Sequence, residues 1–193
     1  MALKTRYTAR PWKALVITVG LAMAVVALLV GEVMAKTAKE INASVDVALE
    51  RFYKQVPDGK SLSEKAKGIL VMPGVVKGAF IVGGEYGEGA LRVEQKTSGY
   101  YNLVAGSFGF QFGGEAKDII IMFMTDDVLK QFRASKGWEA GVDGNVALVT
   151  VGAGERVDLT KINDPIIGFV IDVKGLMVDV SHKGAKFTKV DKK

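Results

Sequence analysis

The sequence predicts an α+β fold, namely a mainly antiparallel curved β-barrel or barrel-like sandwich with packed N-terminal helices. Short β-prone runs recur from residue 69 to residue 190 with glycines between them, which is typical of small sandwiches and barrels. Glycines also gather in two clusters, at residues 83–89 and 106–114. Glycine within or beside a strand marks a bend, a bulge or a close approach of two backbones, as tight curvature requires.

Two helices are predicted before the strands. Residues 36–56 carry apolar side chains at spacings of three and four, and Pro57 and Gly59 follow them, so one face of a helix should be apolar. This apolar stripe consists of Ile41, Val45, Ala48, Phe52 and Val56. A shorter helix follows, in which Ser61 and Glu64 have the spacing of a capping box.

Ten strands and one further helix are expected after these helices. The helix covers Asp126–Ala134, with Thr125 or Asp126 as its N-cap. The expected strands are residues 69–72, 79–82, 90–94, 100–105, 107–112, 119–125, 145–151, 166–173, 176–181 and 186–190.

Two of these strands have distinctive side-chain patterns. In residues 107–112, alternation places Phe108, Phe110 and Phe112 on one face. This aromatic row could form core or the wall of a lipid-binding pocket. Residues 119–124 are apolar at every position, which predicts a strand buried on both faces. The N-terminal helix is the best candidate to cover its outer face.

Composition limits the function classes. The chain has 193 residues, of which 49% are hydrophobic, and a net charge of +5, which suits one globular domain. Residues 1–35 carry +3 of that charge, so the remainder carries only +2. A near-neutral domain of this kind is not expected to bind nucleic acid. The absence of cysteine excludes disulfides, thiolate catalysis and cysteine metal sites.

Residues 1–35 are predicted to be an export signal. Arg10 and Lys13 precede an uncharged apolar run at residues 14–30, and Val33 and Ala35 suit cleavage after Ala35. The run is long for a signal peptide, so a retained N-terminal membrane anchor remains the alternative. Either interpretation predicts a periplasmic or cell-envelope protein, with residues 36–193 as the functional domain.

No catalytic site is predicted. The glycine cluster at residues 83–89 is interpreted as a structural turn, because a phosphate loop would lead into a helix and a strand follows here. His182 is the single histidine, and its spacing from Ser107 and Ser181 does not suggest a hydrolytic triad. We therefore do not expect the chain to be an enzyme or to need a cofactor or a metal.

Four carboxylates flank the glycine clusters. Glu85, Glu88, Glu115 and Asp118 could do acid–base work or bind calcium, but no calcium-loop pattern is present. They are interpreted as solvated turn residues.

The chain resembles the SYLF-domain family in several ordered motifs. These are a KAKG-hydrophobic-proline opening, a VGGEYGEG segment, a GSFG-x-Q-x-G segment, an acidic residue before a hydrophobic strand, and a strand ending in KGL. They correspond to Lys65–Pro73, Val82–Gly89, Ser107–Gly113, Asp118–Met124 and Asp172–Val180. The resemblance extends over roughly residues 40–190 and implies a lipid-binding module. In some eukaryotic relatives it also implies phosphoinositide and actin binding, but an exported bacterial domain would not meet actin.

The expected function is therefore non-catalytic binding of phospholipid or another amphiphile at an anionic membrane surface. Apolar contacts would come from the N-terminal helix or the phenylalanine row, and headgroup contacts from lysines. The alternative is a structural envelope protein that binds protein partners, which the sequence does not identify, and carries no lipid. The candidate lipid-binding residues are Lys65, Lys67, Phe108, Phe110, Phe112, Lys183, Lys186 and Lys189.

Overall fold

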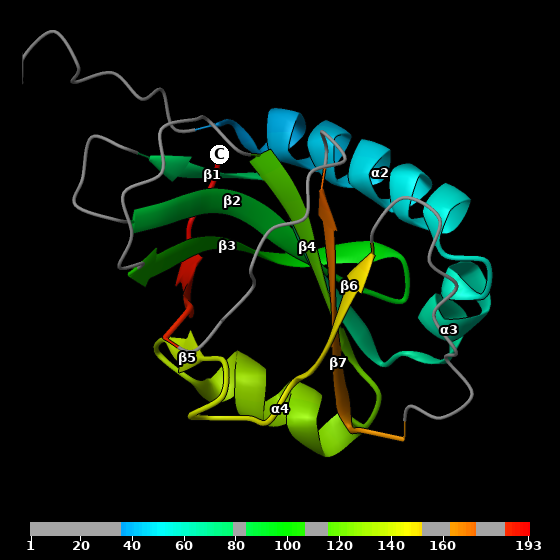
Figure 1. Cartoon of the computed structure of the whole chain (residues 1–193). Helices are drawn as coiled ribbons and strands as arrows, with labels where there is room; N and C mark the ends of the chain where they lie inside the picture. The colour runs from blue at the N-terminus through cyan, green and yellow to red at the C-terminus, as the bar shows by residue number, and fades with distance from the viewer. Residues whose placement is uncertain (1–35, 79–83, 107–115, 152–162, 173–183) are drawn as a thin grey trace, which may run out of the picture. The chain divides into compact units, whose positions relative to one another are not determined.

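The computed structural model describes residues 36–78, 84–106, 116–151, 163–172 and 184–193, which belong to one compact unit, Lys36–Lys193 (Figure 1). Its strands form a single eight-stranded sheet in the order β5-β8-β3-β2-β1-β4-β7-β6. All neighbouring strands are antiparallel except β6 and β7. The elements are α2 (Ala38–Gln55), α3 (Gly59–Lys65), β1 (Gly68–Gly78), β2 (Gly84–Val93), β3 (Lys96–Gly106), β4 (Ala116–Phe123), α4 (Asp126–Ala134), β5 (Trp138–Glu139), β6 (Ala147–Val151), β7 (Ile166–Asp172) and β8 (Lys186–Val190).

The predicted α+β class is confirmed, with a curled half-barrel in place of a closed barrel. Strands β5 and β6 lie at the two edges of the sheet, and no pairing joins them in the described part of the chain. Helix α2 lies along one side of the curled sheet and α4 lies on the other (Figure 1). The sheet therefore has two covered faces and two separate apolar clusters.

The inner cluster fills the curl beneath α4. Phe132 of α4 stacks against Phe123 of β4, with ring centroids 4.6 Å apart, and meets Trp138 edge-on at 5.6 Å. Both geometries are favourable for aromatic pairs. Leu70, Leu91, Leu103 and Phe187, from four different strands, complete the packing.

The outer cluster lies between α2 and the sheet. Every member of the predicted apolar stripe of this helix is at most 1% exposed, and Phe52 packs on Phe169 of β7 with ring centroids 4.9 Å apart. A capping box begins the helix, because Thr37 accepts from the backbone of Glu40 and the Glu40 carboxylate accepts from the backbone of Thr37. The stripe is therefore core, and the expectation that this helix face contacts lipid is wrong for the folded domain.

Strand β4 is buried on both faces, as its uninterrupted apolar sequence predicts. Ile119, Ile121 and Phe123 point into the inner cluster, whereas Ile120 and Met122 pack under α2. The prediction that the N-terminal helix covers this strand is confirmed.

The glycine cluster at residues 83–89 is not a turn in its described part. Gly84, Gly87 and Gly89 lie within β2, and none of them has a positive φ. A Cβ on Gly89 would lie 2.0 Å from the carbonyl oxygen of Val71 and 2.9 Å from the Cα of Met72. Glycine is required there because two backbones approach too closely for any side chain.

A bulge in β1 accounts for this close approach. The register of β1 shifts between Val71 and Val76 against β2, and between Met72 and Val75 against β4. Gly74 lies in the bulge with a φ of +60°, a conformation that favours glycine. The family motif that ends at Pro73 therefore marks a bulge, where a proline without a ladder N–H is tolerated.

The remaining element predictions vary in accuracy. Helix α4 has the predicted bounds with Thr125 as its N-cap, and β8 matches residue for residue. The proposed capping box of Ser61 and Glu64 is wrong, because α3 already begins at Gly59. The two-residue strand β5 was not predicted, and the expected strands at 79–82, 107–112 and 176–181 lie outside the described residues. Within those residues, no helix combines the length and the apolar character that crossing a bilayer would demand.

Candidate functional site

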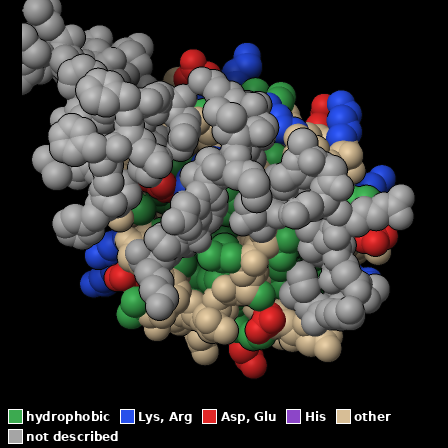
Figure 2. All heavy atoms as spheres, in the orientation of Figure 1, with side chains coloured by type: hydrophobic (Ala, Val, Ile, Leu, Met, Phe, Trp, Pro, Cys, Tyr) green, Lys and Arg blue, Asp and Glu red, His purple; other side chains and the backbone are tan. Residues whose placement is uncertain are grey.

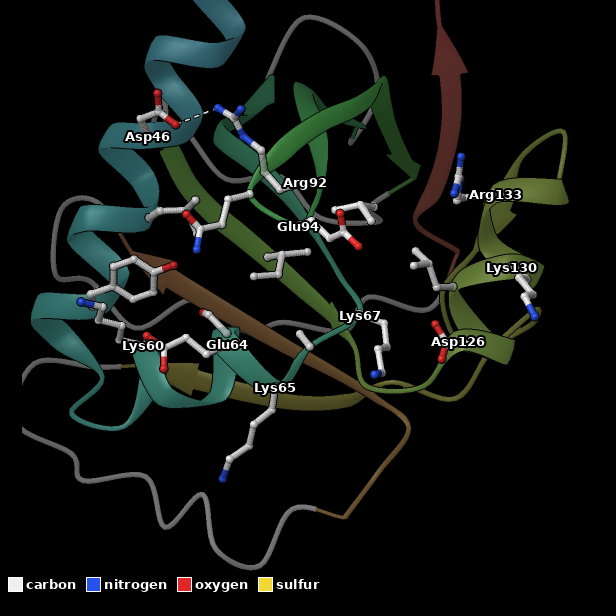
Figure 3. Close-up of a pocket in the computed structure, with 18 residues that line it drawn as sticks. Asp46, Lys60, Glu64, Lys65, Lys67, Arg92, Glu94, Asp126, Lys130 and Arg133 are labelled. Atoms are coloured by element: carbon white, nitrogen blue, oxygen red, sulfur yellow. Dashed lines mark hydrogen bonds and ion pairs between the residues drawn. The ribbon is translucent and has the colours of Figure 1, made fainter.

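A groove of about 800 Å³ lies where α2, α3 and α4 meet the ends of β1 and β2 (Figure 3). Its edge includes the tight β2–β3 turn, in which Glu94 and Gln95 have positive φ values of 49° and 63°. The volume is within the range of small-molecule pockets, roughly 300–1,000 Å³.

The interior of the groove is largely apolar. Leu49 and Tyr53 line it from α2, Ile69 from β1, Val93 from β2 and Leu129 from α4. Four of these side chains are partly buried and Leu129 is buried. They are the outermost side chains of the two apolar clusters, so the groove offers apolar surface that the core does not fully cover.

Cations outnumber anions around this apolar surface. Lys60, Lys65 and Lys67 lie on or just after α3, whereas Lys130 and Arg133 lie on α4, at the opposite side of the groove (Figure 3). All five are exposed, and no ion pair joins any of them to another described residue. With Arg92 included, the lining has six basic and four acidic residues, a net charge of +2.

Arg92 differs from the other five cations because its side chain is held in place. Its guanidinium group donates to Asp46 of α2 at 2.7 Å and to the hydroxyl of Thr97 at 2.7 Å. The Thr97 hydroxyl in turn donates to Asn42 of α2 at 2.7 Å. This chain of contacts fixes α2 on the β2–β3 hairpin and so sets one wall of the groove.

The structure separates the predicted lipid-binding lysines. Lys65 and Lys67 line the groove together. Lys186 and Lys189 are exposed on β8 and, by strand alternation, lie on opposite faces of the sheet; neither lines the groove. Lys183 and the row of Phe108, Phe110 and Phe112 lie outside the described residues, as does His182.

The described carboxylates near the glycine cluster are not solvated turn residues, which corrects the sequence interpretation. Asp118 is 1% exposed and Glu88 is 7% exposed. Asp118 pairs with Arg51 of α2 and accepts from the backbone N–H of Gly74 at 2.9 Å. Burial of a carboxylate is expensive unless charge and hydrogen bonds compensate it, and here the bulge and α2 provide both.

Two further acids are paired in the same region. Glu85 accepts from Lys117 at 2.9 Å, and both side chains are nearly buried. Glu88 accepts from Lys192 at 2.7 Å and from the Tyr86 hydroxyl at 3.0 Å. Burial and the adjacent Glu88 carboxylate raise the pKa of Tyr86 to about 12, so the phenol remains a donor. The fourth predicted carboxylate, Glu115, lies outside the described residues.

Glu85, Glu88 and Asp118 are engaged in structural contacts, and none of them lines the groove. Within the described ranges, no three His, Cys, Asp or Glu side chains are placed to hold a metal ion. The groove itself combines an apolar floor with flexible exposed cations. Its chemistry therefore suits recognition of an amphiphile that carries negative charge.

Sequence reasoning missed part of the groove. Arg92, Lys130 and Arg133 lie far from Lys65 in the sequence, and each occurs as an ordinary surface charge on a strand end or helix. The one usable signal was the polar run Glu94-Gln95-Lys96 after β2, which marks the hairpin end of the sheet.

The fold and the groove define a class of protein, a binding domain built on a curled antiparallel sheet with a helix on each side. Residues 104–193 match the family model Ysc84, described as Las17-binding protein actin regulator. Over these residues the predicted resemblance to the SYLF family is confirmed.

A curated relative has the same family assignment. Beta cell expansion factor A of Aeromonas veronii is 30% identical over 159 residues, which are 79% of this chain and 58% of that relative. The chain thus spans little more than half the length of this relative. Similarity to this family supports a lipid- or protein-binding role.

Proposed function

We propose that this chain is an exported envelope protein whose unit Lys36–Lys193 binds phospholipid or another amphiphile and catalyses no reaction. The observation that carries the proposal is the groove, in which exposed lysines surround a partly buried apolar floor. Such a site can hold a phosphate-bearing headgroup and the first part of an acyl chain at once.

The electrostatic part of this binding comes from the groove rim. Near an anionic membrane surface each Lys or Arg contributes about 1 kcal/mol of attraction. Lys60, Lys65 and Lys67 all come from one short stretch, so they can reach the same headgroup or neighbouring headgroups. The attraction should be screened by salt, since the Debye length falls from about 10 Å at 0.1 M to about 3 Å at 1 M.

Vesicle co-sedimentation tests the proposal. Binding to phosphatidylglycerol vesicles is compared for the wild type, for Lys65→Ala/Lys67→Ala and for Lys186→Ala/Lys189→Ala. The groove variant should bind roughly 30-fold more weakly, as expected for two lost headgroup contacts. The β8 variant is the matched control, because it removes the same charge outside the groove.

The possible outcomes show which pair of lysines contributes to lipid binding. Equal losses for the two variants would show attraction by net charge and leave the groove without a special role. A larger loss for the β8 variant would favour the predicted contacts of Lys186 and Lys189 instead. If the wild type is retained by neither anionic nor phosphatidylcholine vesicles, and no lipid is purified with it, the lipid proposal fails.

A second candidate function is protein binding without lipid. One observation favours it: Val76, Tyr86 and Val104 are direct neighbours across β1, β2 and β3 and are 46%, 39% and 54% exposed. Adjacent exposed apolar side chains mark interaction surfaces more often than single ones. The family description also names binding to a protein partner. Failure of vesicle binding, with a partner captured by wild type but not by Tyr86→Lys, would establish this alternative.

Export is a separate part of the proposal. It is supported by the basic start of the leader, its apolar run and the small residues before Lys36, and by the start of the compact unit at Lys36. N-terminal sequencing of protein from the native host envelope should give Lys36. A chain that retains Met1 in the membrane fraction would instead establish the anchor, and a cytoplasmic protein would overturn export.

A further inference from the structure

Glu88 accepts hydrogen bonds from residues near both ends of the described unit. Its Oε2 accepts from the backbone nitrogen of Lys36 at 2.9 Å, and its Oε1 accepts from Nζ of Lys192 at 2.7 Å. The Tyr86 hydroxyl also donates to Oε1, at 3.0 Å. The carboxylate is only 7% exposed, so it lies in a formed pocket of donors and not on an open surface.

The Lys36 nitrogen belongs to the peptide bond that the proposed export cleavage would break. Hydrolysis of the Ala35–Lys36 amide consumes one water molecule and leaves a carboxylate on Ala35 and an amine on Lys36. At neutral pH most of such α-amino groups are protonated, since their ordinary pKa is about 7.7–8.0. The group that faces Glu88 would then change from a neutral N–H to an ammonium.

We propose that Glu88 is the receiving site for the α-ammonium group that leader removal creates on Lys36, so that processing adds a partly buried ion pair to the fold. The inference rests on the cleavage included in the proposed function. Charge-assisted hydrogen bonds are roughly twice as strong as neutral ones, and the donor geometry is already present before the bond is cut.

The charges around the site suit this role. Oε1 is engaged by Lys192 and Tyr86, whereas the Lys36 nitrogen is the described donor to Oε2. Burial raises the pKa of Glu88, but hydrogen bonds from Lys192, Tyr86 and Lys36 outweigh it and leave the pKa lowered, so the acid is ionised at neutral pH. The carboxylate of Glu40, on the first turn of α2, accepts hydrogen bonds from the backbone N–H and the hydroxyl of Thr37, the residue after Lys36.

The site is specific for one cleavage position. A chain that begins at Ala35 would keep a neutral amide at Lys36 and move its ammonium by one residue, about 3.8 Å between Cα atoms. A chain that begins at Thr37 would lack the donor entirely. Because Ala38 also donates its N–H to the backbone oxygen of Lys193 at 3.2 Å, the new ion pair would add to the contacts that join the start of α2 to residues 192 and 193.

Two chains that differ by one residue test the proposal. The unit Lys36–Lys193 contains both apolar clusters and every described strand, so it can be made alone. Chains that begin at Lys36 and at Ala35 are released from a fusion without added residues, each with Glu88 and with Glu88→Gln. At pH 6.5 the Lys36 chain should melt about 2–4 °C higher than the Ala35 chain, the shift of a modest added interaction in a domain of this size.

The pH dependence has a definite sign. The ion pair raises the pKa of the folded α-amino group above its unfolded value, so the advantage is complete below about pH 7.7 and is lost as the pH rises through the raised pKa. It should be absent with Glu88→Gln at every pH. NMR titration of the α-amino group measures the raised pKa directly in the wild-type chain, even if Glu88→Gln folds poorly.

Different results would contradict the ion pair and the proposed cleavage. An ordinary α-amino pKa, or equal melting temperatures for the two chains at pH 6.5, would overturn the inference and leave lipid binding untouched. Intact mass of protein from the native host decides the cleavage. A native chain that begins anywhere but Lys36 would overturn the processing on which the inference rests.

Discussion

Charged side chains at the two ends of the β1–β2 pair differ in their exposure and in their partners. At the groove end, Lys65 and Lys67 are exposed and pair with no described acid. At the bulge end, Asp118 and Glu88 are buried and fully engaged. Charges of the second kind hold the backbone in place, because breaking their contacts leaves an uncompensated buried charge. Charges of the first kind cost the fold little and remain available to a ligand.

In the face that Figure 2 shows, hydrophobic side chains gather towards the middle of the described part, and charged side chains lie around its edge. Substitutions at the two ends should therefore separate into those that lower stability and those that lower binding.

The largest effect is expected at Gly89. Gly89→Ala would place a Cβ against the backbone of Val71 and Met72, and the free energy of unfolding should fall by about 3 kcal/mol or more, the upper end of overpacking costs. Gly84→Ala is the control, because its nearest neighbour, the Ala105 carbonyl, would be 3.7 Å away. That control should change stability by less than about 1 kcal/mol. Urea unfolding measures both, and equal losses would show that the glycines of β2 are not matched to the bulge.

Loss of Arg51 should have the next largest effect. Arg51→Ala leaves Asp118, with a side chain 2% exposed, without its cation. We expect a loss of about 2–3 kcal/mol, somewhat below the range for fully buried pairs because Arg51 is partly exposed. Asp46→Ala removes the exposed partner of Arg92 and should cost at most about 1 kcal/mol. Similar losses in chemical denaturation would contradict the distinction between buried and exposed pairs.

Glu88 should give a smaller effect that depends on pH. Because the folded pKa of Glu88 lies below the ordinary value of 4.5, its contribution is present above that pH and is lost as the pH falls through the lowered pKa. At pH 7, Glu88→Gln should reduce the free energy of unfolding by about 1.5 kcal/mol, the scale of a hydrogen bond to a charged group. Unfolding curves from pH 7 to pH 3 should show the wild type and the variant converging, and a constant difference would contradict the lowered pKa.

The smallest stability effect is expected in the groove. Lys65→Ala/Lys67→Ala should change the free energy of unfolding by less than about 0.5 kcal/mol, as surface substitutions usually do, while vesicle binding falls. A large loss of stability would mean that these lysines hold α3 in place, and the binding result would then need another explanation.

Strong periodicity made much of the fold predictable. The stripe of α2, the bounds of α4 and the double burial of β4 follow from patterns that local burial imposes on neighbouring residues. The cluster at Gly84, Gly87 and Gly89 was misjudged because a close approach of two backbones depends on the partner strand. Nothing within β2 reveals the bulge in β1.

The site was less predictable for the same reason. Lys65 and Lys67 were predicted to bind lipid, but the groove that they line is completed by α4 and by the β2–β3 hairpin. The partners of Glu88 and Asp118 lie 104 and 67 residues away in the sequence. Sequence spacing cannot distinguish a carboxylate with such a remote cation from one that is solvated.

If the leader were retained as a membrane anchor instead of being cleaved, the contact between Lys36 and Glu88 would also limit how far the groove can lie from that anchor. Glu88 and the groove residue Val93 lie five positions apart on β2, about 17 Å at the rise of an extended strand. An anchor that ends so near the groove would keep the local concentration of membrane lipid at the groove high. Weak intrinsic affinity for a single lipid would then suffice for stable occupancy of the groove.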